Sequence, residues 1–241
     1  MIKLIIQITK IIITTILGFL MFSCGNFNSI SGNGNVVTTN RNVPNFTSIE
    51  AKTGLEVILE QSNVTNVKVE ADDNLQEHIF TEVENGVLKI YCDANFYKSD
   101  ARKVYVKSPV YNGIYASSGA SIESQNTIKS QNLAVESNSG SEITLKVETQ
   151  KLFCDSSSGS NIELAGTATN LETVSSSGST INLSDLIAQN VQANSSSGSS
   201  TSVHAIEKLS ADASSGSSIE YRETPKEISK NESSGGSVSQ E

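Results

Sequence analysis

A repeat of about 19 residues fills the second half of the chain and restricts its fold more than any other feature. Small residues cluster around seven glycines, which are Gly119, Gly140, Gly159, Gly178, Gly198, Gly216 and Gly235. The spacings between successive glycines are 21, 19, 19, 20, 18 and 19 residues. Self-similarity at a nearly fixed period is typical of proteins built from stacked repeats.

Apolar residues recur at constant positions around each glycine and form columns when the repeats are aligned. An isoleucine column three residues after the glycine contains Ile122, Ile143, Ile162, Ile181, Thr201, Ile219 and Val238. Five residues after the glycine lie Ser124, Leu145, Leu164, Leu183, Val203 and Tyr221. A leucine column seven residues before it contains Leu133, Leu152, Leu171, Val191, Leu209 and Ile228. A small-residue column five residues before it contains Val135, Cys154, Thr173, Ala193, Ala211 and Lys230. Each pair of columns is two residues apart, which is the side-chain period of a β-strand.

A repeat of this length cannot enclose a hydrophobic core by itself. Stacked repeats can, because each strand pairs with its copy in the next repeat at about 4.8 Å and identical positions pile up inside. The sequence therefore predicts an all-β fold, a parallel β-helix or β-solenoid with rungs of roughly 19 residues. Regular rungs are expected over residues 116–241, with a fraying tail from about Pro225, where Lys230 interrupts the small-residue column.

The serine and glycine residues at each corner have a structural explanation. Glycine tolerates the positive φ that a sharp bend between strands requires. Serine is small enough to stack closely and can hydrogen-bond to neighbouring backbone. Residues 156–160 and their copies are therefore interpreted as turn residues. The alternative is a functional one, a hydroxyl-rich strip that binds sugars or another surface.

Residues 41–115 contain strand-like runs without the serine signature, among them residues 67–71 and 104–106. They predict irregular N-terminal β rungs that cap the solenoid, because an exposed end invites edge-to-edge pairing. Asn85-Gly86 predicts a hairpin turn. Residues 72–79 are expected to form a short helical or looped excursion.

Residues 1–23 predict an export signal. Lys3 and Lys10 give it a basic start, and its apolar run, residues 11–22, is shorter than the roughly 20 residues of a membrane-spanning helix. Residues 20–25 resemble a bacterial lipobox, which implies cleavage before Cys24 and lipidation of Cys24. The alternative is an ordinary cleaved signal with an incidental cysteine. Residues 24–40 are mostly small and polar and are expected to form a flexible tether.

Cys92 and Cys154 are the two remaining cysteines. They form neither a disulfide framework nor a metal-ligand spacing. We expect two buried thiols that act as small hydrophobic side chains, because Cys154 lies in the small-residue column. A disulfide between them is the alternative that export would allow.

Four segments of the N-terminal half carry a family resemblance. They are residues 42–49, 54–57, 67–75 and 85–90. Together with the Ser-Ser-Gly-Ser repeats they resemble the family called putative auto-transporter adhesin, head GIN domain. The resemblance covers about residues 38–221. It implies an exported protein, often a lipoprotein, of a Bacteroidetes-type bacterium, and it brings no catalytic motif to this chain.

Catalytic and metal-binding patterns are absent from the sequence. Glu123, Glu163 and Glu220 share one outward position in three repeats; a solvated face explains them, and a sparse cation-binding column is the alternative. His78 and His204 have no visible nucleophile or carboxylate partner and are expected at the surface. The formal net charge of −9 argues against a nucleic-acid ligand. No cofactor is expected.

These observations predict a non-enzymatic cell-envelope lipoprotein, an adhesin-like or scaffold β-solenoid that binds glycan or protein. Its partners would be the outer membrane, through the lipid on Cys24, and a glycan or protein ligand. The side of that membrane, the ligand and the oligomeric state are not readable. The alternative is a carbohydrate-active β-helix enzyme, which would need several acidic or basic side chains converging in one groove.

Overall fold

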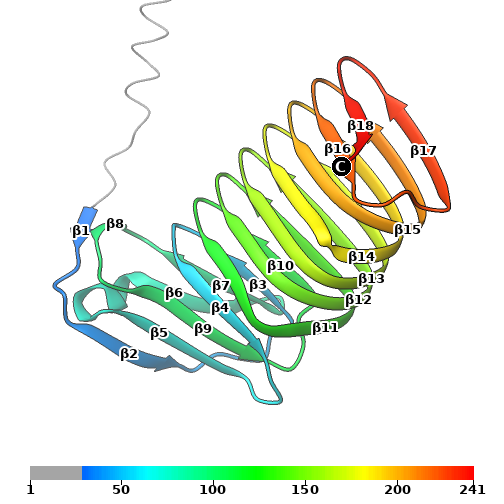
Figure 1. Cartoon of the computed structure of the whole chain (residues 1–241). Coiled ribbons are helices and arrows are strands. Elements are labelled where there is room, and N and C mark those ends of the chain that lie inside the picture. The colour runs from blue at the N-terminus through cyan, green and yellow to red at the C-terminus, as the bar shows by residue number, and fades with distance from the viewer. Residues whose placement is uncertain (1–28) are drawn as a thin grey trace, which may run out of the picture.

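The computed structural model describes residues 29–241, which form a β-solenoid of about seven turns with rungs of roughly 19 residues (Figure 1). The fold predicted from the repeat is therefore confirmed. The strands of the N-terminal half are β1 (Ser29–Ser31), β2 (Val36–Arg41), β3 (Ser48–Ala51), β4 (Glu56–Gln61), β5 (Asn66–Asp72), β6 (Ile79–Glu84), β7 (Val87–Cys92), β8 (Asn95–Lys98), β9 (Arg102–Ser108) and β10 (Gly113–Ala116). The C-terminal strands are β11 (Ser121–Asn138), β12 (Glu142–Ser157), β13 (Asn161–Ser175), β14 (Thr180–Ser195), β15 (Ser200–Ala213), β16 (Ser218–Tyr221), β17 (Glu227–Glu232) and β18 (Ser237–Gln240). A 3₁₀ helix, η1 (Asp73–His78), occupies the excursion predicted over residues 72–79.

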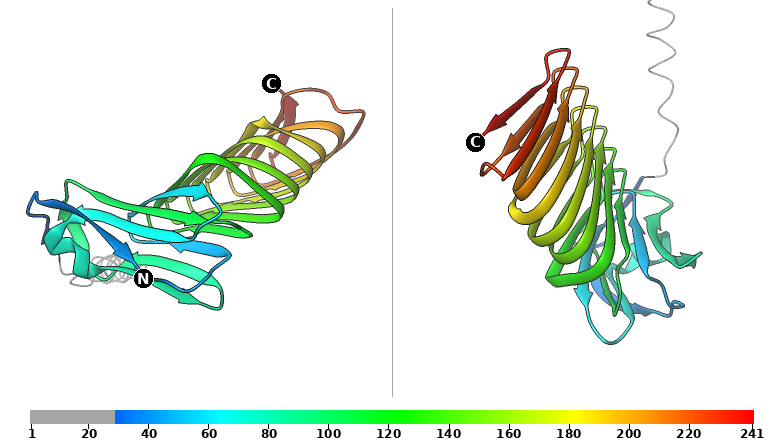
Figure 2. Two further views of the ribbon diagram at one scale, coloured as in Figure 1. Left: turned by 90° about the horizontal axis from the view of Figure 1, so that it is seen from below. Right: turned by 90° about the vertical axis from the view of Figure 1, so that its right-hand side faces the viewer.

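Strands β11 to β15 are long because each one bends and contributes to two faces of the solenoid (Figure 2). We call the face built by their C-terminal parts, together with β7, β3, β10 and β17, the A face. We call the face built by their N-terminal parts, together with β9, β4, β16 and β18, the B face. Pairing between successive rungs is parallel on both faces, as stacking of equivalent repeats requires.

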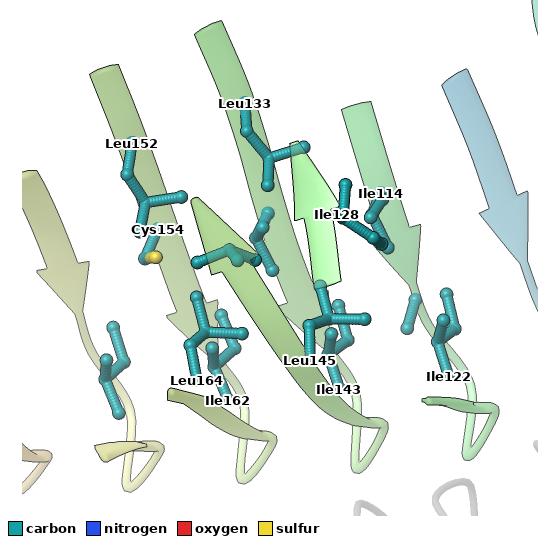
Figure 3. Packing of buried hydrophobic residues seen from close by; sticks show 14 of the residues in the cluster. Ile114, Ile122, Ile128, Leu133, Ile143, Leu145, Leu152, Cys154, Ile162 and Leu164 are labelled. Atoms are coloured by element: carbon teal, nitrogen blue, oxygen red, sulfur yellow. The ribbon is translucent and has the colours of Figure 1, made fainter. Parts of the chain in front are cut away.

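The core consists of the predicted columns in register. The isoleucine column pairs residue by residue from Ile122 to Val238. The leucine column and the small-residue column on the A face likewise keep register from Leu133 and Val135 onward. Side chains of the two faces point toward each other and close the interior (Figure 3). Ile143, Ile162 and Ile181 are all 0% exposed.

Each corner is a tight turn in which two residues have positive φ. In the turn of residues 157–160, Ser158 has φ 55° and Gly159 has φ 70°. A β-carbon on Gly159 would meet nothing within 4 Å, so glycine is required there by its backbone conformation and not by lack of space. The Gly159 amide donates to the carbonyl of Ser177 in the next rung, 3.1 Å away.

Buried serines flank most of these turns and satisfy the backbone at the bend. Ser160 Oγ lies within hydrogen-bonding distance of the carbonyls of Ser157 (2.7 Å) and Ser137 (2.6 Å), either of which can accept its proton, and it lies 2.9 Å from Ser156 Oγ. Equivalent bonds join the neighbouring rungs. The interpretation of residues 156–160 as turn residues agrees with these contacts, since the flanking hydroxyls are buried and used internally.

Antiparallel strands close the N-terminal end of the solenoid. On the B face β9 pairs antiparallel with β5, and β5 pairs antiparallel with β2. On the A face β6 and β7 form a hairpin whose turn is Asn85-Gly86, as predicted. Residues 41–115 thus combine parallel rungs with an antiparallel cap, which covers the edge that a bare solenoid would expose.

The tether predicted over residues 24–40 is wrong from residue 29 onward. β1 pairs with β8 and β2 pairs with β5, so this segment is part of the fold. Asp72 holds the link between β1 and β2 in place. Its side chain is 0% exposed and accepts hydrogen bonds from the amides of Gly34 (2.6 Å), Asp100 (2.9 Å) and Ala101 (3.4 Å). Small polar residues indicated flexibility here because their long-range partners are invisible in the local sequence. The signal over residues 1–23 and the lipidation site Cys24 lie outside the described residues.

The expected fraying from Pro225 is also corrected, because β17 and β18 form a last rung on β15 and β16. Every residue of β17 is exposed, since no further rung covers it. Lys230 occupies the last position of the small-residue column, and its Nζ donates to Tyr221 Oη (2.9 Å) and to the Val238 carbonyl (3.2 Å). A lysine in this place covers the open end with charge, which disfavours pairing with another edge.

Candidate binding groove

An open groove runs along the A face across strands β11 to β15. Its volume is about 730 Å³, larger than the hollows on the B face and at the N-terminal cap. We call it the axial groove, since it follows the stacking direction of the rungs. Asn112 lies at its N-terminal end and Lys208 at its C-terminal end.

Two columns of outward side chains line the axial groove. The first, which we call the amide column, contains Asn132, Lys151, Asn170, Asn190 and Lys208. The second, which we call the mixed column, contains Ala134, Phe153, Glu172, Gln192 and Ser210. They alternate with the leucine column, which faces the core, because successive residues of a strand point to opposite faces. The repeat that builds the core therefore also builds the groove.

Hydrogen-bonding groups of the amide column are available to a ligand. Asn190 Nδ2 donates to Asn170 Oδ1 at 3.1 Å, and both side chains keep further donor or acceptor capacity. At five successive rungs of about 4.8 Å, the column presents polar groups over about 19 Å. The lining contains two lysines and a single carboxylate, Glu172. This lining suits recognition of a neutral polar chain better than acid–base chemistry, which needs paired carboxylates or a base.

The N-terminal end of the A face is more apolar. Phe153 of β12 pairs with Ala134 of β11, and Ala134 pairs with Gly113 of β10. A β-carbon on Gly113 would lie only 2.4 Å from Tyr115 Oη and 2.6 Å from Tyr115 Cζ. The Tyr115 ring therefore lies across Gly113 on the outer surface, where glycine makes room for it.

Two carboxylates, Glu136 and Asp155, follow two positions after Ala134 and Phe153 on the same strands. They pair in register, so they are neighbours on the A face. Burial raises the pKa of both carboxyls, and Asp155 further raises the pKa of Glu136. Burial and then Glu136 also raise the pKa of Tyr115. The pair adds hydrogen-bond acceptors beside the aromatic residues.

The structure does not bring the other sequence candidates together into a site. Glu123 and Glu163 are two rungs apart on the B face, with Thr144 between them, and Glu220 is three rungs further along. No group of residues that could hold a metal ion occurs within residues 29–241. His78 pairs with Asp93 through Nδ1 at 2.8 Å and is partly exposed. The surface prediction for His204 is wrong: it is 8% exposed, with Nε2 3.7 Å from Glu223.

The cysteine prediction holds. Cys92 and Cys154 are free and buried, and Cys154 packs between Val135 and Thr173 in register. Burial raises the pKa of both thiols, although a hydrogen bond with Thr53 opposes this for Cys92. Neither thiol is reactive in this state, because the thiolate is the nucleophile.

The axial groove was not predicted from the sequence. The signal for it exists, since asparagine and lysine recur eight residues before the corner glycine at every rung from Asn132 to Lys208. Outward polar residues are also the ordinary state of a soluble surface, and the concave shape that distinguishes this column depends on how each strand bends.

The family is decided by a match over most of the folded region. A family model described as "Putative auto-transporter adhesin, head GIN domain" matches residues 45–225. This chain belongs to that family. The head GIN resemblance seen in the sequence is thereby confirmed. No curated protein matches the chain.

Several solved structures share the fold of this chain. A putative adhesin from Bacteroides fragilis has a TM-score of 0.83 at 24% identity, and the match covers 88% of this chain and 100% of that one. A putative adhesin from Parabacteroides merdae has a TM-score of 0.75 at 20% identity, covering 89% and 99%. A protein from Parabacteroides distasonis described as a putative lipid binding protein has a TM-score of 0.73 at 22% identity, covering 89% and 100%.

A membrane-spanning helix is not found in the part of the chain that the model describes, where no helix is both long and apolar enough.

Proposed function

We propose that this head GIN protein is a non-enzymatic, adhesin-like module of the cell envelope that binds a glycan in the axial groove. The amide column carries the proposal, because it offers amide and ammonium groups at every rung over a length of about 19 Å. Sugars expose hydroxyl groups at regular intervals, and amide side chains both donate to and accept from them. Many weak contacts along a rigid surface add up to useful affinity.

Membership of the adhesin family supports binding over catalysis. The geometry supports it as well. Glycoside hydrolysis uses two carboxyl groups that flank the scissile bond. Glu136 and Asp155 instead project side by side from one open face, and the groove lining itself has a single carboxylate. A globular protein partner is a weaker fit, because interface centres are rich in Tyr, Trp and Arg and the groove lining has none of these.

A binding assay on the purified protein tests the proposal. Arrayed bacterial and host polysaccharides are expected to capture the protein. Asn170→Ala with Asn190→Ala should weaken capture about thirtyfold, since each of the two lost hydrogen bonds contributes about 1 kcal/mol. The matched control is Asn161→Ala, because Asn161 belongs to β13 like Asn170 but lies on the B face. Capture that is unaffected by the groove variants would locate the site elsewhere, and release of reducing ends would favour the enzyme.

A further inference from the structure

Two partly exposed aromatic residues, Phe153 in the axial groove and Tyr115 beside its N-terminal end, lie in line with the stacking direction. Phe153 and the ring of Tyr115 over Gly113 are separated by one rung, that of Ala134. Two steps between rungs are about 9.6 Å. Ala134 between them is half-buried and too small to rise above the rings. The three residues therefore form an apolar strip along the stacking direction, bordered by polar residues on both sides.

The two borders of this strip differ in hydrogen-bonding character. On one side stand the carboxylates of Glu136 and Asp155, which accept only, and neither has a hydrogen-bond or ion-pair partner within residues 29–241. On the other side stand Asn132 and Lys151 of the amide column, which supply N–H donors, and the Asn132 amide oxygen also accepts. A ligand that fits must present an apolar face to the strip and polar groups to both edges.

A pyranose ring has that chemistry. Its C–H groups form an apolar face that stacks on aromatic rings, and its hydroxyls radiate from the edge as both donors and acceptors. Hydroxyl donors satisfy the carboxylates without an opposite charge, which suits a neutral sugar. One pyranose in an extended chain is about as long as one rung is high, so consecutive sugars can meet equivalent positions of consecutive rungs.

We propose that Tyr115, Ala134 and Phe153 form the principal sugar subsite, on which a linear neutral glycan stacks and from which it runs along the axial groove, about one sugar per rung. Glu136 and Asp155 accept hydrogen bonds from its hydroxyls on one side, and the amide column binds the other side. This inference rests on the proposed function and specifies its ligand class, its direction and its strongest contacts.

The test uses titration calorimetry of the purified full chain with linear β-1,4-linked oligosaccharides of glucose, N-acetylglucosamine and xylose, each from two to eight residues long. Phe153→Ala is expected to weaken binding about tenfold, as loss of an aromatic stacking platform does. Tyr115→Ala, which removes the ring over Gly113, should weaken binding by a similar factor. The matched control is Tyr97→Ala, because Tyr97 is 73% exposed on β8 and distant from the groove strands.

Two further measurements distinguish binding at the aromatic subsite from binding along the rest of the axial groove. Affinity should rise with chain length up to about six sugars, one for each rung from β10 to β15, and then level off. Phe153→Trp places the only tryptophan in a chain that has none, and its emission should shift when the sugar binds. Thermal unfolding of each variant shows whether it is folded.

The outcomes are distinguishable. Loss of binding in Asn170→Ala with Asn190→Ala but not in Phe153→Ala would overturn the subsite and leave the proposed function standing. Levelling off at two or three sugars would overturn the axial direction. Absence of binding by every oligosaccharide in the set, while arrayed polysaccharides still capture the protein, would overturn the inference alone. Absence of both would overturn the proposed function too.

Discussion

Thr173 and Thr201 show how differently one residue type can behave in the same core. Both are 0% exposed. Thr173 lies in the small-residue column between Cys154 and Ala193, and its Oγ1 has no hydrogen-bond partner among residues 29–241. Thr201 interrupts the isoleucine column, and its Oγ1 lies 2.8 Å from Ser175 Oγ and 2.9 Å from Ser195 Oγ. A hydroxyl in the core is costly only where it stays unpaired.

Replacing Thr173 by Val is therefore expected to stabilise the protein. The change keeps the shape and removes an unpaired polar atom, which should raise the free energy of unfolding by about 1 kcal/mol. Thr201→Val is the matched control and should lower it by about 1 kcal/mol, because it deprives Ser175 and Ser195 of a partner. Urea unfolding measures both, and equal effects of the two substitutions would contradict the argument.

At the scale of elements, the segment that links β1 to β2, which we call the joint, depends on the buried carboxylate of Asp72. Burial alone would raise the pKa of Asp72, but the amides of Gly34, Asp100 and Ala101 outweigh burial and lower the pKa below its ordinary value. A carboxyl whose pKa is lower in the folded state stabilises the fold above its unfolded pKa of about 3.9, and that stability is lost as the pH falls through the folded value. The joint should thus weaken in acid.

Asp72→Asn should weaken the joint at neutral pH as well, because the asparagine amide brings donors toward three N–H donors. Hydrogen exchange is the measurement: the amides of Gly34 and Asp100 should exchange at least about tenfold faster than in the native chain. In the native chain the same acceleration should appear only below about pH 4. Asp73→Asn is the control, because the exposed Asp73 carboxylate bonds to the side chains of Asn33 and Asn35. Unchanged exchange in Asp72→Asn would show that pairing of β1 with β8 alone holds the joint.

The sequence was most informative for elements that repeat. Columns such as Ile143 over Ile162 could be predicted because every rung solves the same packing problem. The segment over residues 29–41 could not, since its order depends on Asp72 and on pairing with residues 26 to 67 positions away in the sequence. The axial groove was predictable only in part. Its lining residues recur in the sequence, but its hollow shape and the position of the Tyr115 ring over Gly113 depend on how the strands bend and pack.

At the scale of the whole molecule, β1 and the last rung lie at opposite ends (Figures 1 and 2). Cys24 is five residues before Ser29, and five residues span at most about 18 Å. A lipid on Cys24 would therefore hold the cap near the membrane. The groove on β11 to β15 would stand on the far side of the cap from that lipid.

Cys24→Ser is expected to abolish this attachment. The native protein should fractionate with membranes and incorporate labelled palmitate, and the variant should do neither, since the acyl chains provide the hydrophobic anchor. Cys92→Ser is the matched control, because the buried Cys92 thiol already hydrogen-bonds with Thr53 and a hydroxyl can do the same. Membrane retention and labelling of the Cys24 variant would refute lipidation there.

The parallel register of the rungs has an evolutionary consequence. Since each rung contacts only its neighbours, a duplicated unit can enter between two others with its buried columns already matched. Such an insertion would lengthen the molecule and its outward columns by the same step, without a new core. Duplication of a repeat within the gene would in this way change the length of the solenoid, and with it the length of glycan that the proposed groove can bind, by one rung at a time.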